Sequence, residues 1–161
     1  MRFTLYTFLF CLFFFSQQSI AQDYDSALGF RIGFPTSISY KKFVVEDKAF
    51  ELHGGWRSRT DFNEIRLNAA YLFHKQIGDI DFFNWYWGFG GGGTFYILDP
   101  SILADGRPSI QANGYLGIEY TLEGVPIQLS IDWIPTLSIG GFNKGLQGGI
   151  GGVAIRYILS N

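Results

Sequence analysis

Residues 82–97, which read FFNWYWGFGGGGTFYI, constrain the fold of this chain more than any other stretch. Trp85, Trp87 and Phe89 share one parity, and most of the residues between them are small or polar, which is the period of a strand with one apolar face. At about 3.3 Å per residue such a strand is about 50 Å long, enough to cross a bilayer at a tilt and project beyond it. The glycines at 90–93 weaken an ordinary strand but suit a strongly curved barrel wall. The segment predicts the middle strand of a small transmembrane β-barrel.

Seven further segments alternate in the same way. Pro35 separates the first two, and a single strand bulged at Pro35 is the alternative, but it would leave seven strands where single-chain bacterial barrels have an even number. We therefore predict an all-β fold, an eight-stranded antiparallel up-and-down transmembrane β-barrel preceded by a cleaved signal peptide. Besides 82–97, the predicted strands are 27–34, 37–43, 49–57, 63–74, 109–121, 127–133 and 147–159.

The first 21 residues have the pattern of a secretory signal peptide. Arg2 precedes an apolar run over residues 5–15, and Ser19 and Ala21 place small residues before a cut ahead of Gln22. The alternative is a retained anchor helix, but the apolar run is well short of the ~20 residues that a spanning helix needs. We expect a signal peptide at 1–21 and a barrel domain at 22–161. Because Cys11 leaves with the signal, the mature chain has no disulfide.

The composition favours a membrane barrel and argues against several other classes. Aromatic residues make up 19% and charged residues 16% of the chain, a departure from soluble averages in the direction of barrels with aromatic girdles. A formal net charge of −2 gives no basic excess for nucleic acid. The two histidines lie far apart and no helix is expected after the glycine run, so we predict no metal, phosphate site or cofactor.

The apolar parity is predicted to face lipid and the polar parity the lumen. A soluble lipocalin-like barrel, with its apolar face around an inner cavity, is the alternative reading. The polar parity favours the membrane barrel because it carries glycine, serine, amides and isolated charges in place of the dense lysine and glutamate of a water-facing sheet. Tyrosine and tryptophan on the lipid parity predict an aromatic belt: Tyr40, Trp56, Tyr71, Trp85, Tyr120, Trp133 and Tyr157.

Short segments throughout the mature chain carry a resemblance to a known group. They are 31–35 (RIGFP), 40–43 (YKKF), 84–86 (NWY) with the following glycines, 132–135 (DWIP) and 151–157 (GGVAIRY). With these segments the chain resembles small OmpA/OmpX-like outer-membrane barrels, most closely uncharacterised barrels of Bacteroidota-type bacteria. The resemblance implies a monomer in the cell outer membrane that contacts lipopolysaccharide and is inserted by the outer-membrane insertion machinery. The chain departs from the group by ending on Asn161 where an aromatic residue is usual.

Charged residues on the lumen parity predict an ionic plug, because an eight-stranded barrel is just wide enough for side chains to fill and unpaired interior charges are costly. We expect one network in which Arg156 and Arg31 pair with Asp132, Glu119 and Glu51, with Arg156 beside Asp132. A second pair is expected between Arg66 and Glu64, or through Arg57. A narrow pore is the alternative. The predicted lumen network is Arg31, Glu51, Glu119, Asp132, Arg156, Arg66, Glu64 and Arg57.

The sequence indicates an architecture more than an activity. We expect a structural or surface-interaction protein with both termini in the periplasm and the long 98–108 connection outside, where it could meet an extracellular partner. A barrel-embedded lipid A-modifying enzyme, a deacylase or acyltransferase, is the alternative. Neither His53 nor His74 is followed by a serine two residues later, so no catalytic residue is assigned and an enzyme is not expected.

Overall fold

The computed structural model describes residues 24–33, 35–58, 62–98, 108–141 and 144–160. The predicted signal peptide and most of the 98–108 connection lie outside this part of the chain. No helix occurs among the described residues. The strands are β1 (Ser26–Gly33), β2 (Ser37–Val45), β3 (Lys48–Ser58), β4 (Phe62–Gln76), β5 (Phe83–Leu98), β6 (Ser109–Thr121), β7 (Ile127–Trp133), β8 (Thr136–Ile139), β9 (Gly145–Gln147) and β10 (Gly151–Ser160).

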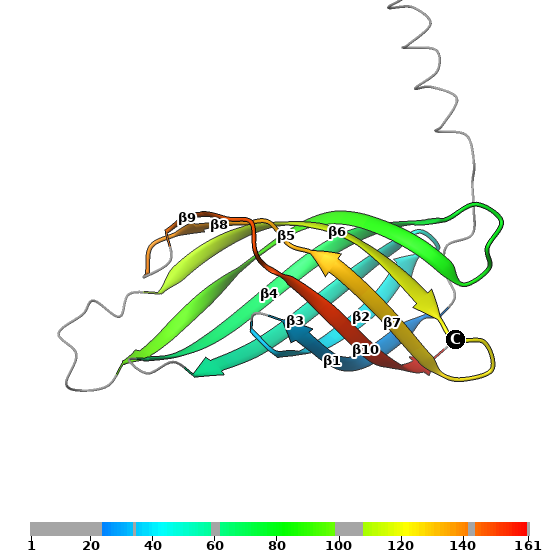
Figure 1. Cartoon of the computed structure of the whole chain (residues 1–161), viewed down its shortest axis with the longest axis horizontal. Coiled ribbons are helices and arrows are strands. Elements are labelled where there is room, and N and C mark those ends of the chain that lie inside the picture. The colour runs from blue at the N-terminus through cyan, green and yellow to red at the C-terminus, as the bar shows by residue number, and fades with distance from the viewer. Residues whose placement is uncertain (1–23, 34, 59–61, 99–107, 142–143, 161) are drawn as a thin grey trace, which may run out of the picture.

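These strands form one closed antiparallel barrel (Figure 1). Each strand from β1 to β6 pairs with the next strand in chain order. β7 then pairs with β10, and β10 pairs with β1, which closes the wall. β7 and β8 are one wall strand interrupted at Pro135, because both pair with β6 on the same register, from Leu116↔Trp133 to Asn113↔Thr136. β9 and β10 together make the last wall strand. The predicted eight-stranded antiparallel up-and-down barrel is confirmed.

The two ends of the barrel differ. At the termini end lie the beginning of β1, the end of β10 and the short turns β2–β3, β4–β5 and β6–β7; the opposite end, with the other connections, is called the loop end. The β6–β7 turn contains Glu123 and Gly124, and Gly124 has a φ of +72°, which glycine adopts without strain.

The glycines of β5 permit close strand packing rather than room for bulky side chains. A Cβ built at Gly90 would lie 2.3 Å from the backbone oxygen of Ala69, and one at Gly92 would lie 2.0 Å from that of Leu67. Both positions are on the lumen parity, where the β4 backbone lies close to β5. The glycines therefore permit this close contact between the two strand backbones.

The alternation of side chains places apolar residues outside and polar residues inside. Phe30 and Ile155 are 66% and 50% exposed, whereas the neighbouring Arg31 and Arg156 are 3% and 0% exposed. Among the described residues, buried polar and charged side chains outnumber buried apolar ones. This polarity is the inverse of that of a water-soluble domain.

An apolar cluster closes the lumen at the termini end. Tyr24, just before β1, packs edge-on against Phe43 with ring centroids 5.2 Å apart. Leu72 and Ile158 belong to the same cluster. Burial raises the pKa of the Tyr24 hydroxyl well above its usual value, and the nearby Glu119 carboxylate acts in the same direction. The chain entering the barrel therefore packs into the lumen and seals that end.

Candidate functional site

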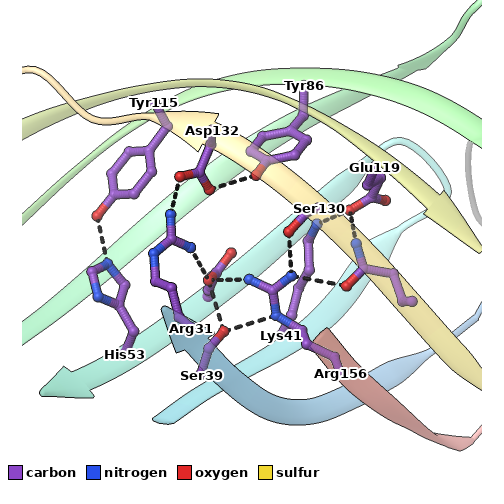
Figure 2. A network of polar contacts seen from close by, with 12 residues as sticks. Arg31, Ser39, Lys41, His53, Tyr86, Tyr115, Glu119, Ser130, Asp132 and Arg156 are labelled. Carbon is purple, nitrogen blue, oxygen red and sulfur yellow. Dashed lines mark hydrogen bonds and ion pairs between the residues drawn. The ribbon is translucent and has the colours of Figure 1, made fainter. Parts of the chain in front are cut away.

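The middle of the lumen holds a connected set of buried polar side chains (Figure 2). Arg156 of β10 lies at its centre and is fully buried. Its Nη2 donates to Glu51 Oε1 at 2.6 Å, and its Nε donates to Ser39 Oγ at 2.8 Å. Its Nη1 donates to Gln128 Oε1 and to Ser130 Oγ, each at 2.8 Å. One guanidinium thus joins β10 to β2, β3 and β7.

The Glu51 carboxylate of β3 contacts two arginine side chains. Besides Arg156, its Oε1 accepts a hydrogen bond from Ser39 Oγ at 2.8 Å and one from Arg31 Nη1 at 3.4 Å. Arg31 also forms an ion pair with Asp132. Tyr86 of β5 donates its hydroxyl to the other oxygen of Asp132, at 2.7 Å. The chain of contacts therefore crosses the whole lumen, from β3 to β5.

A second ion pair lies closer to the termini end. Lys41 of β2 pairs with Glu119 of β6, and both side chains are fully buried. His74 Nε2 lies 3.6 Å from Glu119 Oε1. Gln128 donates to Glu119 Oε2 at 3.1 Å while its oxygen accepts from Arg156. Gln128 therefore connects this pair to the Arg156 cluster.

The aromatic ring of Tyr86 packs against two of these side chains. The Lys41 ammonium lies 4.6 Å from the centroid of the Tyr86 ring, within the range of a cation–π interaction. The imidazole of His74 stacks on the same ring, with centroids 5.1 Å apart. The charged groups are thus packed against aromatic side chains as well as paired.

Toward the loop end the lumen is polar and more loosely bonded. His53 Nε2 and Tyr115 Oη are 3.0 Å apart, and Asn113 donates to Asn68 Oδ1 at 2.8 Å. Arg66 and Glu64 form an ion pair at 3.8 Å, near the limit for such a contact. Neither oxygen of the buried Glu64 carboxylate has a hydrogen-bond partner among the described residues.

The structure brings most of the predicted lumen residues together, and the expected pairs of Arg31 with Glu51 and Asp132 and of Arg156 with Glu51 are present. Two expectations differ from the structure. Arg156 lies opposite Gln128, and Asp132 lies opposite Gly152. The predicted pairing of Arg156 with Asp132 is wrong, since the register offsets the two along the strands. Glu119 pairs with Lys41 in place of the two arginines. The Arg66–Glu64 pair is present, and Arg57, opposite Glu64 in register, is half-buried.

The predicted lumen residues lack six members of this network, which are Ser39, Lys41, His74, Tyr86, Gln128 and Ser130. The signal for Lys41 was available, because it alternates with Tyr40 in the same strand as Ser39. Lysine is usually exposed in soluble proteins, and that expectation outweighs the parity unless the interior is already known to be charged.

The aromatic residues predicted to form a belt all lie on the outer face. Trp56, Tyr157, Trp133 and Tyr120 are 63%, 58%, 50% and 39% exposed, and the remaining three are half-buried. Four of the seven lie in the strand halves nearest the termini end, and Trp56 lies toward the loop end. Tyr40 and Trp133 lie nearer the middle of the wall, so the set forms one incomplete ring, near the termini end. The members near the termini end are Tyr71, Trp85, Tyr120 and Tyr157.

The described part of the chain offers neither a metal-binding group nor a membrane-spanning helix. No three His, Cys, Asp or Glu residues there are grouped so that they could hold a metal ion. Within the same residues, no helix is long and apolar enough to span a membrane. Comparison of the chain with protein-family models, curated proteins and solved structures finds no match.

Proposed function

We propose that the mature chain is a monomeric outer-membrane β-barrel that serves as a structural or surface-interaction protein, with a lumen closed by side chains. The observation that carries the proposal is the inverted polarity of the wall. Large apolar side chains such as Phe30, Ile110 and Ile131 are 66%, 71% and 53% exposed on strands whose inner faces are charged. A face of this kind is stable in lipid and would aggregate in water.

Export and orientation follow from the chain's two ends. The N-terminal pattern at 1–21 is that of a cleaved leader, and the described chain begins and ends at the same end of the barrel. An even number of strands puts both termini on the same side of the wall. With that side in the periplasm, as is usual for outer-membrane barrels, the 98–108 connection would lie outside. OmpA/OmpX-like barrels are the group to which we assign the architecture. Its expected contacts are lipopolysaccharide, the insertion machinery and an external partner at 98–108.

The lumen contacts support a structural role more than a transport role. Arg156 alone connects four wall strands, and the Lys41–Glu119 pair connects two more points of the wall. Side chains that span the lumen in this way would obstruct a continuous path. The rigid barrel would then stabilise the membrane and present its loop end to a partner.

Expression of the full chain in a Gram-negative host tests this proposal. We expect the protein in the outer-membrane fraction, with a mature mass that begins at Gln22 and a gel mobility that changes on boiling, as folded barrels show. An epitope inserted in the 98–108 connection should be digested by protease added to intact cells. Recovery in the soluble fraction without detergent would contradict the proposal. A changed lipid A mass profile would favour the enzyme alternative.

A further inference from the structure

The wall of the barrel is lower at the first hairpin than on either side. Pairing between β2 and β3 ends at Ser37↔Gly55, whereas β3 continues to Ser58. Pairing between β1 and β10 ends at Gly33↔Gly152, and β9, before β10, pairs only with β8 among the described strands. Figure 1 shows this hairpin ending well short of β4 and β5. The loop-end half of the wall therefore has a notch above the β1–β2 turn.

Inside the notch lies a small polar hollow. Its volume is about 20 Å³, room for about one water-sized group. Arg66, His53, Ser37 and Arg31 line it. Arg31 is paired with Glu51 and Asp132, and Arg66 lies 3.8 Å from Glu64, near the limit for an ion pair. No aspartate or glutamate lines the hollow. Ser37 is 5% exposed, and its hydroxyl has no hydrogen-bond partner among the described residues. The lining therefore favours a small anionic group.

Outside the notch lies a long apolar groove across β1 to β4. Leu52, Trp56, Ile65 and Leu67 line it with Phe30 and Ile38. Its floor is Gly54, the one outward position of β3 between Leu52 and Trp56 that has no side chain.

The groove and the hollow meet at the β1–β2 turn. Pro35 lines the inner hollow and Thr36 lines the outer groove. The turn packs tightly on β3 here, since a Cβ at Gly55 would lie 2.7 Å from both Pro35 Cγ and Thr36 O. A hydrocarbon chain bound in the outer groove and a charged group bound in the inner hollow would therefore be separated only by this turn.

We propose that the notch binds a single-chain anionic amphiphile of the fatty-acid class, with the hydrocarbon chain in the outer groove and the carboxylate bonded to Arg66 and Ser37 in the hollow. Arg66 is 6% exposed, so its guanidinium can hold a carboxylate away from bulk water, where such contacts are strongest. The hollow is too small for a phosphorylated sugar head group. The site rests on the proposed membrane placement, which supplies the ligand from the bilayer.

Quenching of single tryptophans in phosphatidylcholine nanodiscs tests the site. One protein keeps only Trp56, in the groove, and a matched protein keeps only Trp87, an outward residue of β5 that is 48% exposed; the other tryptophans become Phe. The probe is a fatty acid brominated in mid-chain, and its methyl ester is the uncharged comparison. Quenching of Trp56 by the acid should saturate at low mole fraction, whereas quenching of Trp87 should rise in proportion to the probe.

Variants separate the site from general partitioning. Arg66→Gln should raise the half-saturating acid concentration about tenfold, the equivalent of one lost hydrogen bond to a charged group. Arg57→Gln removes the same charge from a residue that does not line the hollow and should leave it unchanged. Gly54→Leu, or Leu67→Phe if the first fails to fold, should abolish saturation by filling the groove.

Three results would overturn the proposal. They are proportional quenching of both tryptophans, saturation that the methyl ester reproduces, and equal effects of the two arginine changes. Brominated phosphatidylcholine should quench Trp87 in the protein that keeps this tryptophan. If it does not, the membrane placement itself is contradicted, and the amphiphile site with it.

Discussion

Arg156 of β10 and Glu51 of β3 form a 2.6 Å ion pair across the lumen, although their strands are not neighbours in the wall. Both side chains are buried, and each has further polar partners. A contact between non-adjacent strands constrains the cross-section of the barrel, which strand pairing alone does not. The pair is therefore the most direct test of the ionic plug.

Arg156→Met should destabilise the barrel by about 3 kcal/mol, because it leaves Glu51 with a partly compensated buried charge. Adding Glu51→Gln should recover part of this loss, since no carboxylate is then left unpaired. Urea unfolding in lipid vesicles, followed by tryptophan fluorescence, measures both. Arg156→Met combined with Asp132→Asn is the comparison, and it should recover less than Glu51→Gln does, because Asp132 is connected to Arg156 only through Arg31 and Glu51. Recovery with Asp132→Asn but not with Glu51→Gln would restore the pairing predicted from the sequence.

The glycine run of β5 gives a second prediction, with its control in the same strand. Gly90→Ala should destabilise the barrel by about 1–3 kcal/mol, because the added Cβ would lie 2.3 Å from the Ala69 backbone oxygen. At Gly93, on the outer face, the nearest atom to an added Cβ is 3.4 Å away. Gly93→Ala should thus fold and unfold like the parent in the same urea titration. Equal effects of the two changes would mean that the close approach of the β4 backbone is not what requires glycine at position 90.

The strand count and the inner and outer faces could be read from the sequence because both are local properties. Ile155 and Arg156 fall on opposite faces by period alone, and the structure agrees. The partner of Arg156 could not be read, because it depends on the register between β7 and β10 and on which strands face each other across the lumen. The same holds beyond Trp133, where the predicted strand ends, because resumption of the ladder at Thr136 depends on pairing with β6.

Planar bilayer recordings should show no stable channels from the purified barrel. Tyr86, Arg156 and Lys41 fill the middle of the lumen, and the apolar cluster around Tyr24 and Phe43 closes the termini end. A lumen of eight strands has no space left for a water column once side chains of this size occupy it. Large, voltage-independent conductance that scales with protein amount would show that the plug opens in the membrane.

The absence of cysteine from the predicted mature chain allows a direct test of which face meets lipid. Ile131 and Ser130 are neighbours on β7, but Ile131 is 53% exposed and Ser130 is 4% exposed. Ile131→Cys, labelled with a nitroxide in refolded protein, should collide readily with oxygen dissolved in the bilayer and poorly with a water-soluble nickel chelate. Ser130→Cys should react slowly with the label, since its side chain faces Arg156 at 2.8 Å. Ile155→Cys and Ala154→Cys repeat the comparison on β10, where the exposed fractions are 50% and 1%. Greater collision of the Ile131 and Ile155 labels with the nickel chelate than with oxygen would mean that the apolar face meets water, and the proposed membrane placement would be wrong.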